Sequence, residues 1–164
     1  MAEPIHINDL GDPQLTPEQR AARDYGETLD IQLTPESILA EAAANTGLDD
    51  FGSDDFRERL ALLCDEWGGD AGLAGIGRLS LRNKLLQHAT SRLLIRVLLR
   101  RHPEIHEVQI RKPIIVVGLP RSGTTHLLNL MAADSRLRSL PLWESYEPVP
   151  LPGEQPLDGV DPRY

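Results

Sequence analysis

The residues best suited to chemistry form a glycine-bounded loop at positions 118–123. The loop reads Gly-Leu-Pro-Arg-Ser-Gly; it follows a short β-branched run at 114–117 and precedes two threonines that open an apolar helical pattern. The order strand, glycine loop, helix predicts an anion site, because turning backbone N–H groups and the positive end of a helix dipole both attract negative charge. The glycine spacing is that of a phosphate-binding loop.

The loop differs from the common phosphate-loop pattern G-x-x-x-x-G-K-[ST], because Thr124 stands where the lysine is expected. Arg121 lies inside the loop and supplies a planar, permanently charged group instead. The hydroxyls of Ser122, Thr124 and Thr125 can donate to the oxygens of an anion.

Three functions compete for such a loop. A kinase or nucleotide triphosphatase would need the missing lysine, and residues 127–164 show no apolar strand ending in the aspartate that holds Mg²⁺. A phosphosulfate needs no metal, since its leaving phosphate can be stabilised by backbone N–H groups and one fixed cation. We therefore favour sulfuryl transfer. A degenerate phosphate-loop kinase or triphosphatase, and a non-catalytic helical module whose loop binds nothing, stay open as alternatives.

Composition places the chain among globular proteins. It has 164 residues, 40% of them hydrophobic, and a formal net charge of −8, which makes nucleic acid an unsuitable partner. Cys64 is the single cysteine and is expected to be a buried apolar residue, so a reducing, cytoplasmic location is predicted. The N-terminus lacks a signal peptide pattern, and no apolar run reaches the roughly 20 residues that span a bilayer.

Helices are predicted along most of the chain before the loop. Thr16 and Thr34 are each followed by Pro-Glu, which is typical of a capped helix start, and the second helix should end near Asn45. Another helix should begin at Ser53 and end at the glycine pair 68–69. Its predicted apolar stripe is Phe56, Leu60, Leu63 and Trp67.

The longest predicted helix covers residues 78–101 and stops before Pro103. Its apolar face contains Leu85, Ala89, Leu93 and Val97, and a second face carries Arg92, Arg96 and Arg100. We interpret the arginine face as solvated or paired with acids, and a ligand or membrane surface is the alternative. His102 and His106 are four apart, but Pro103 argues against one helix face and so against a zinc site.

The fold class predicted from this order is α/β. A helical N-terminal region, residues 1–110, would be followed in residues 111–164 by the start of a phosphate-loop-type parallel sheet. Only 114–117 is a clear strand, with 140–143 a possible second, and the proline-rich end after Glu147 should be irregular. A sheet with so few strands is incomplete, so we expect the chain to be the N-terminal part of a longer enzyme or a truncated product.

The loop and its surroundings resemble the sulfotransferases that use 3'-phosphoadenosine 5'-phosphosulfate. Residues 113–131 are similar to their 5'-phosphosulfate-binding loop, with the core P-[KR]-[ST]-G-T-T. The bacterial, actinobacterial-type branch is the closer resemblance. There a helical region, His-Pro-Glu, the loop, and Leu-Trp-Glu before a proline-rich tract occur in this order, as they do here at 102–104, 118–125 and 142–144.

The resemblance implies roles for particular residues. Arg121, Ser122, Gly123, Thr124 and Thr125 would bind the 5'-phosphosulfate, with Arg121 also catalytic in stabilising the leaving group. Glu144 would be the general base that takes the acceptor's proton. A surface acid beside Trp143 is the alternative for Glu144, and His126 is the rival base.

The resemblance also implies a co-substrate and partners. The donor would be 3'-phosphoadenosine 5'-phosphosulfate, with no metal, and the acceptor a small molecule, lipid or glycan bearing a hydroxyl. The family's 3'-phosphate site, an arginine and serine pair on a later strand and helix, is expected beyond Tyr164. Ser135, Arg136 and Arg138 are too near the loop to be assigned to it.

Overall fold

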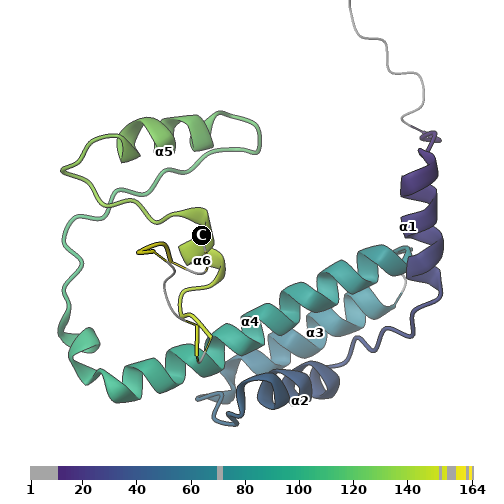
Figure 1. The fold of residues 1–164 in the computed structure, drawn as a ribbon, viewed down its shortest axis with the longest axis horizontal. Coiled ribbons are helices and arrows are strands. Elements are labelled where there is room, and N and C mark those ends of the chain that lie inside the picture. Colours follow the sequence, from purple (N-terminus) through teal and green to yellow (C-terminus); the bar gives the residue numbers. More distant parts are fainter. Residues whose placement is uncertain (1–10, 70–71, 152, 155–157, 162, 164) are drawn as a thin grey trace, which may run out of the picture. The chain divides into compact units, whose positions relative to one another are not determined.

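The computed structural model describes residues 11–69, 72–151, 153–154, 158–161 and 163. Within them the chain forms helices joined by turns and extended segments (Figure 1). In chain order the elements are α1 (Pro17–Glu27), α2 (Pro35–Thr46), the 3-10 helix η1 (Asp54–Phe56), α3 (Arg57–Gly68), α4 (Gly75–Arg101), the 3-10 helix η2 (Pro103–Glu107), α5 (Thr124–Ala132) and α6 (Leu142–Tyr146).

Both threonine-initiated helices are confirmed. Thr16 caps α1 with a full capping box, in which its hydroxyl accepts from the N–H of Gln19 and the Gln19 side chain accepts from the N–H of Thr16. The hydroxyl of Thr34 accepts from the N–H of Ser37 at 3.2 Å. Each threonine thereby satisfies a backbone donor that has no partner within its helix.

The chain divides into two compact units, residues 1–41 with 53–86 and residues 42–52 with 87–164. The boundary predicted between residues 110 and 111 separates a helical region from a phosphate-loop core; it does not coincide with the division into these two units and stays a prediction. In the first unit, Arg82 donates to Glu41 at 2.5 Å and to the carbonyl of Gln32 at 3.0 Å. Glu27 accepts from the backbone N–H of Gly75 at 2.9 Å, which fixes the start of α4 three residues earlier than predicted.

The arginine face of α4 lies in the second unit and is paired, as predicted. Arg96 and Arg100 both form ion pairs with Asp50, and Arg92 donates to the carbonyl of Phe51 at 2.6 Å. The three arginines therefore hold the 47–52 loop against α4. This arrangement favours the structural interpretation of the stripe over a ligand or membrane surface.

The buried side chains confirm most of the predicted apolar faces. On α4, Leu85, Ala89 and Leu93 are buried, and Leu94 joins them in place of Val97, which is only partly covered. On α3 the buried pair is Leu60 and Cys64, which confirms the expected role of the cysteine. The predicted α3 stripe was wrong at Leu63, which is 37% exposed, because the buried position is Cys64, one residue later; Phe56 and Trp67 are half-buried.

The predicted α/β class is wrong for this structure, because the described residues contain no β-strand and no parallel sheet. Residues 114–117 lie outside every helix and outside any assigned strand. Their Ile114, Ile115 and Val117 side chains are 62%, 77% and 85% exposed. A strand exists only through hydrogen bonds to a neighbouring strand, and none of the described segments supplies one.

The second predicted strand, residues 140–143, was also wrong. Pro141 is the N-cap of α6, and Leu142 and Trp143 form its first turn. Proline cannot donate a ladder hydrogen bond, but its fixed φ suits a helix start. A four-residue apolar run does not distinguish the two structures, and here the helix forms.

Candidate anion-binding loop

The predicted loop leads directly into helix α5, as the sequence indicated. The N–H of Ser122 donates to the carbonyl of Leu119 at 3.1 Å and closes a turn. Gly123 is the N-cap of α5 and has φ +90°, in the left-handed region where glycine carries no side-chain penalty. Arg121 also lies there, at φ +66°, where an L-residue is strained.

Gly118 is needed for a different reason, which is close approach. A β-carbon placed on it would lie 2.6 Å from the hydroxyl oxygen of Ser122 and 2.8 Å from the γ-methyl of Thr124. The loop therefore folds back so that Ser122 and the first residue of α5 lie over Gly118. Both glycines of the motif thus have a physical role in the turn.

The first backbone donors of α5 have no partner among the residues that the structure describes. The first N–H that bonds back within the helix is that of Leu127, which donates to the carbonyl of Gly123 at 3.1 Å. The N–H groups of Thr124, Thr125 and His126 precede it, and the glycine N-cap has no side chain to satisfy them. With the helix dipole they make a cradle suited to an anion.

Arg121 adds a full positive charge to this cradle. Its side chain is exposed, and among the described residues it makes no hydrogen bond or ion pair. The guanidinium is therefore available to a ligand. Thr125 is exposed and Thr124 half-buried, so both hydroxyls lie at the surface of the same helix start.

Glu144 lies in α6, away from direct contact with the loop. Its carboxylate accepts a hydrogen bond from Arg138 at 2.7 Å, and its side chain is 23% exposed. None of its described contacts joins it to residues 121–125. The structure thus brings the five loop residues together and leaves Glu144 in a separate ion pair.

A second arginine lies beside Glu144 and was not singled out from the sequence. The guanidinium of Arg163 is 4.8 Å from the centre of the Trp143 ring, and it donates to the carbonyl of Glu147 at 2.7 Å. Hydrogen bonds from the Arg163 side chain and backbone lower the pKa of Asp161 from 3.8 to about 2. Arg163 lies 20 positions from Trp143 and 16 from Glu147, beyond the range of helical periodicity, so no simple spacing signal predicts these two contacts.

Two histidines considered from the sequence, His126 and His102, make no described contact with the loop or with Glu144. His126 is exposed in the first turn of α5. His102 is the N-cap of η2, and its Nδ1 lies 2.9 Å from the carboxylate of Glu104. Across the described part of the chain, no group of three or more histidine, cysteine or acidic side chains is placed to hold a metal ion. Among the same residues no helix is both long enough and apolar enough to cross a membrane.

Comparison with known proteins identifies what this segment is similar to. Residues 113–162 match the family model described as the sulfotransferase family. The crystal structure of sulfotransferase STF1 from Mycobacterium tuberculosis H37Rv is 39% identical, with a TM-score of 0.68, over 74% of this chain and 33% of that one. Sulfotransferase STF9 from Mycobacterium avium is 33% identical, with a TM-score of 0.67, over 74% of this chain and 31% of its own.

These matches confirm the resemblance to bacterial sulfotransferases that the sequence indicated. A search of curated proteins finds no match. The chain spans about a third of the length of the two mycobacterial sulfotransferases. Large exposed apolar side chains at 114–117 and along α5, including Leu127, Leu128 and Leu130, belong to the part of the chain that contains the family match.

Proposed function

We propose, from the match of residues 113–162 to the sulfotransferase family model, that the loop of this chain binds the 5'-phosphosulfate of 3'-phosphoadenosine 5'-phosphosulfate. The chain would supply the 5'-phosphosulfate site of an enzyme that moves a sulfuryl group to an acceptor hydroxyl. The observation that carries this proposal is the loop: Arg121 has no partner among the described residues and lies beside unpaired N–H groups at the start of α5.

The loop residues have distinct roles in the proposed reaction. The N–H groups of Thr124 and Thr125 and the hydroxyl of Ser122 would hold the 5'-phosphate oxygens. Arg121 would neutralise charge on the phosphate as the bond from sulfur to the bridging phosphate oxygen breaks. Such groups stabilise developing charge best when they are already in place, and the left-handed conformations of Arg121 and Gly123 shape the turn that carries them.

Glu144 is the proposed general base. The acceptor oxygen would attack sulfur, adenosine 3',5'-bisphosphate would leave, and the hydroxyl proton would pass to the Glu144 carboxylate. Arg138 now occupies that carboxylate at 2.7 Å, so it would have to share Glu144 with the acceptor. The acceptor class, whether small molecule, lipid or glycan, and the cytoplasmic location stay predictions from the sequence.

Binding calorimetry on the whole chain tests the donor proposal. We expect adenosine 3',5'-bisphosphate to bind in the presence of EDTA, and Arg121→Ala to weaken that binding at least tenfold. Arg101→Ala, which removes an exposed cation at the end of α4, is the matched control and should bind as the parent does.

Two outcomes would favour the alternatives. Tight binding of ATP with Mg²⁺ in the absence of any response to the bisphosphate would support a degenerate phosphate-loop kinase or triphosphatase. No response to either ligand, with a folded protein, would support a non-catalytic helical module. In both cases the sulfotransferase proposal for this chain would be rejected.

A further inference from the structure

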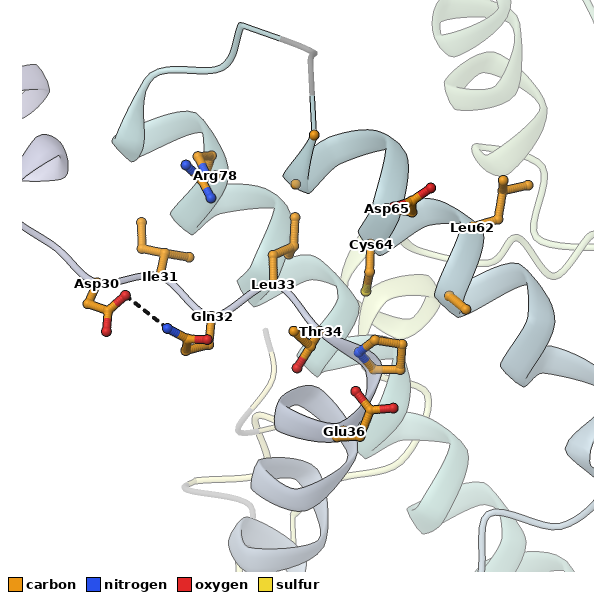
Figure 2. A pocket seen from close by; sticks show the side chains of 14 residues that line it. Asp30, Ile31, Gln32, Leu33, Thr34, Glu36, Leu62, Cys64, Asp65 and Arg78 are labelled. Atoms are coloured by element: carbon orange, nitrogen blue, oxygen red, sulfur yellow. Dashed lines mark hydrogen bonds between the residues drawn. The ribbon is translucent and has the colours of Figure 1, made fainter.

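The first compact unit contains a large groove that is lined by none of the loop residues (Figure 2). It is open to solvent and has a volume of about 940 Å³. Its walls are the connector between α1 and α2, residues of α3 from Ala61 onward, and Arg78 of α4. The side chains used below are Asp30, Ile31, Leu33, Glu36, Leu62, Asp65 and Arg78, all of which Figure 2 labels.

Arg78 is the one lining residue with an unmet hydrogen-bonding need. Its Nε is buried and has no partner among the described residues. Arg82, one turn later on the same helix, shows the contrast, because it is held by Glu41 and by the carbonyl of Gln32. A buried donor without an acceptor costs about 1–3 kcal/mol, so a small turn of the Arg78 side chain that presented Nε to a ligand oxygen in the groove would be favourable.

The other polar side chains of the groove are mainly acceptors. The carboxylates of Asp30, Glu36 and Asp65 line it, and Asp30 holds the Gln32 amide at 2.9 Å through one oxygen only. Ionised carboxylates accept hydrogen bonds and cannot donate them. The groove therefore offers several acceptors and one cationic donor, with a formal charge of −2 from three acids and one arginine.

Cys64 in the same groove is inert. Its burial, and then the nearby Glu36 carboxylate, raise the pKa of the thiol. A protonated thiol is a poor nucleophile and a poor metal ligand. Cys64 therefore gives the groove neither a nucleophile nor a metal ligand.

We propose that this groove binds an uncharged molecule with several hydroxyl groups, such as a sugar or cyclic polyol. Each hydroxyl can donate to a carboxylate and accept from Arg78, which meets both kinds of polar group at once. An inorganic anion would be repelled by three acids, and a cation would leave the buried Nε unsatisfied. Ile31, Leu33 and Leu62 provide apolar surface for the C–H face of a ring.

The test follows the side-chain Nε–H signals of arginine by nuclear magnetic resonance in the whole chain. Cellobiose, trehalose and myo-inositol are the probes, and sodium sulfate and spermidine are the charged comparisons. We expect at least one of the polyols to shift the Arg78 signal saturably and to leave the Arg82 signal unchanged. Neither sodium sulfate nor spermidine should shift the Arg78 signal as strongly as that polyol does.

Two variants separate binding from folding. Asp65→Asn keeps the shape of an exposed acceptor but removes its charge, and Arg78→Lys keeps the charge but loses the Nε donor. Each should weaken polyol binding at least fivefold, read from the backbone signals of Leu33 and Thr34, while circular dichroism stays as in the parent. The inference does not depend on sulfuryl transfer, so the Arg121 experiments can fail without affecting it.

The proposal would be overturned if none of the three polyols shifts Arg78. It would equally be overturned if sulfate or spermidine shifts the Arg78 signal more strongly than every polyol, or if polyol binding survives both substitutions unchanged.

Discussion

Replacing Arg121 by glycine and by alanine should separate backbone strain from ligand binding. Arg121 has φ +66°, which costs an L-residue about 1–2 kcal/mol. Glycine removes that cost but loses roughly 0.5–1 kcal/mol through the greater freedom of the unfolded chain. Alanine keeps the strain and, like glycine, loses the guanidinium.

The two variants should therefore differ in stability and agree in binding. We expect Arg121→Gly to be more stable than Arg121→Ala by about 0.5–1 kcal/mol. With a urea dependence of about 2 kcal/mol per molar, this is a midpoint difference of about 0.3–0.5 M. Both should bind adenosine 3',5'-bisphosphate roughly ten- to a hundredfold more weakly than the parent, which is the usual loss for one charged hydrogen bond.

Urea unfolding followed by circular dichroism, together with calorimetry on the same samples, measures both effects. Arg121→Lys is the control, since it keeps a cation and the strained φ and should retain part of the affinity. If Arg121→Gly is less stable than Arg121→Ala, the left-handed turn is not strained as described. If either truncated variant binds like the parent, Arg121 is not part of the site.

Three further predictions concern the loop turn and the surroundings of Glu144. Gly118→Ala should lower the free energy of unfolding by about 1–3 kcal/mol in urea, because its β-carbon would lie 2.6 Å from the Ser122 hydroxyl. Adding Ser122→Gly should restore part of the loss, and a double variant as unstable as Gly118→Ala would contradict the contact. A double-mutant cycle of Arg138→Gln and Glu144→Gln, measured as free energies of unfolding, should give a coupling energy of about 0.2–1 kcal/mol, as for an exposed ion pair. A coupling energy of zero would show that Arg138 does not hold Glu144. Asp161 has its pKa lowered by Arg163, so its contribution to stability is complete above pH 3.8 and is lost as the pH falls through about 2. In a Trp67→Phe background, Trp143 fluorescence should change over that interval as Arg163 is released from the ring, and Asp161→Asn should remove the change.

Local signals predicted the helices well because each is encoded within a few residues. Thr16 and Thr34 cap their helices through contacts three residues away, and Pro103 ends α4 by its own geometry. The spacing of Leu85, Ala89 and Leu93 gave the buried face of α4 for the same reason. The loop turn was also predictable, since its glycines are required by φ at Gly123 and by close approach at Gly118.

The features that could not be predicted depend on partners distant in sequence. Residues 114–117 have the composition of a strand, but a strand needs a second segment, and the described chain pairs none with them. The pairing of Arg138 with Glu144 bridges six residues across a turn, which no helical or strand period anticipates. Asp50 as the acceptor for Arg96 and Arg100 was equally hidden, although the acid-paired stripe itself was foreseen.

The most direct test of the central claim is a titration of the isotope-labelled chain with adenosine 3',5'-bisphosphate, without metal, followed through backbone amide signals. If the start of α5 binds the 5'-phosphate, the signals of Gly123, Thr124 and Thr125 should shift the most and move downfield, as expected for N–H groups that gain an anionic acceptor. Shifts confined to other residues, or amide signals at 123–125 that stay in place while the ligand binds, would contradict the claim.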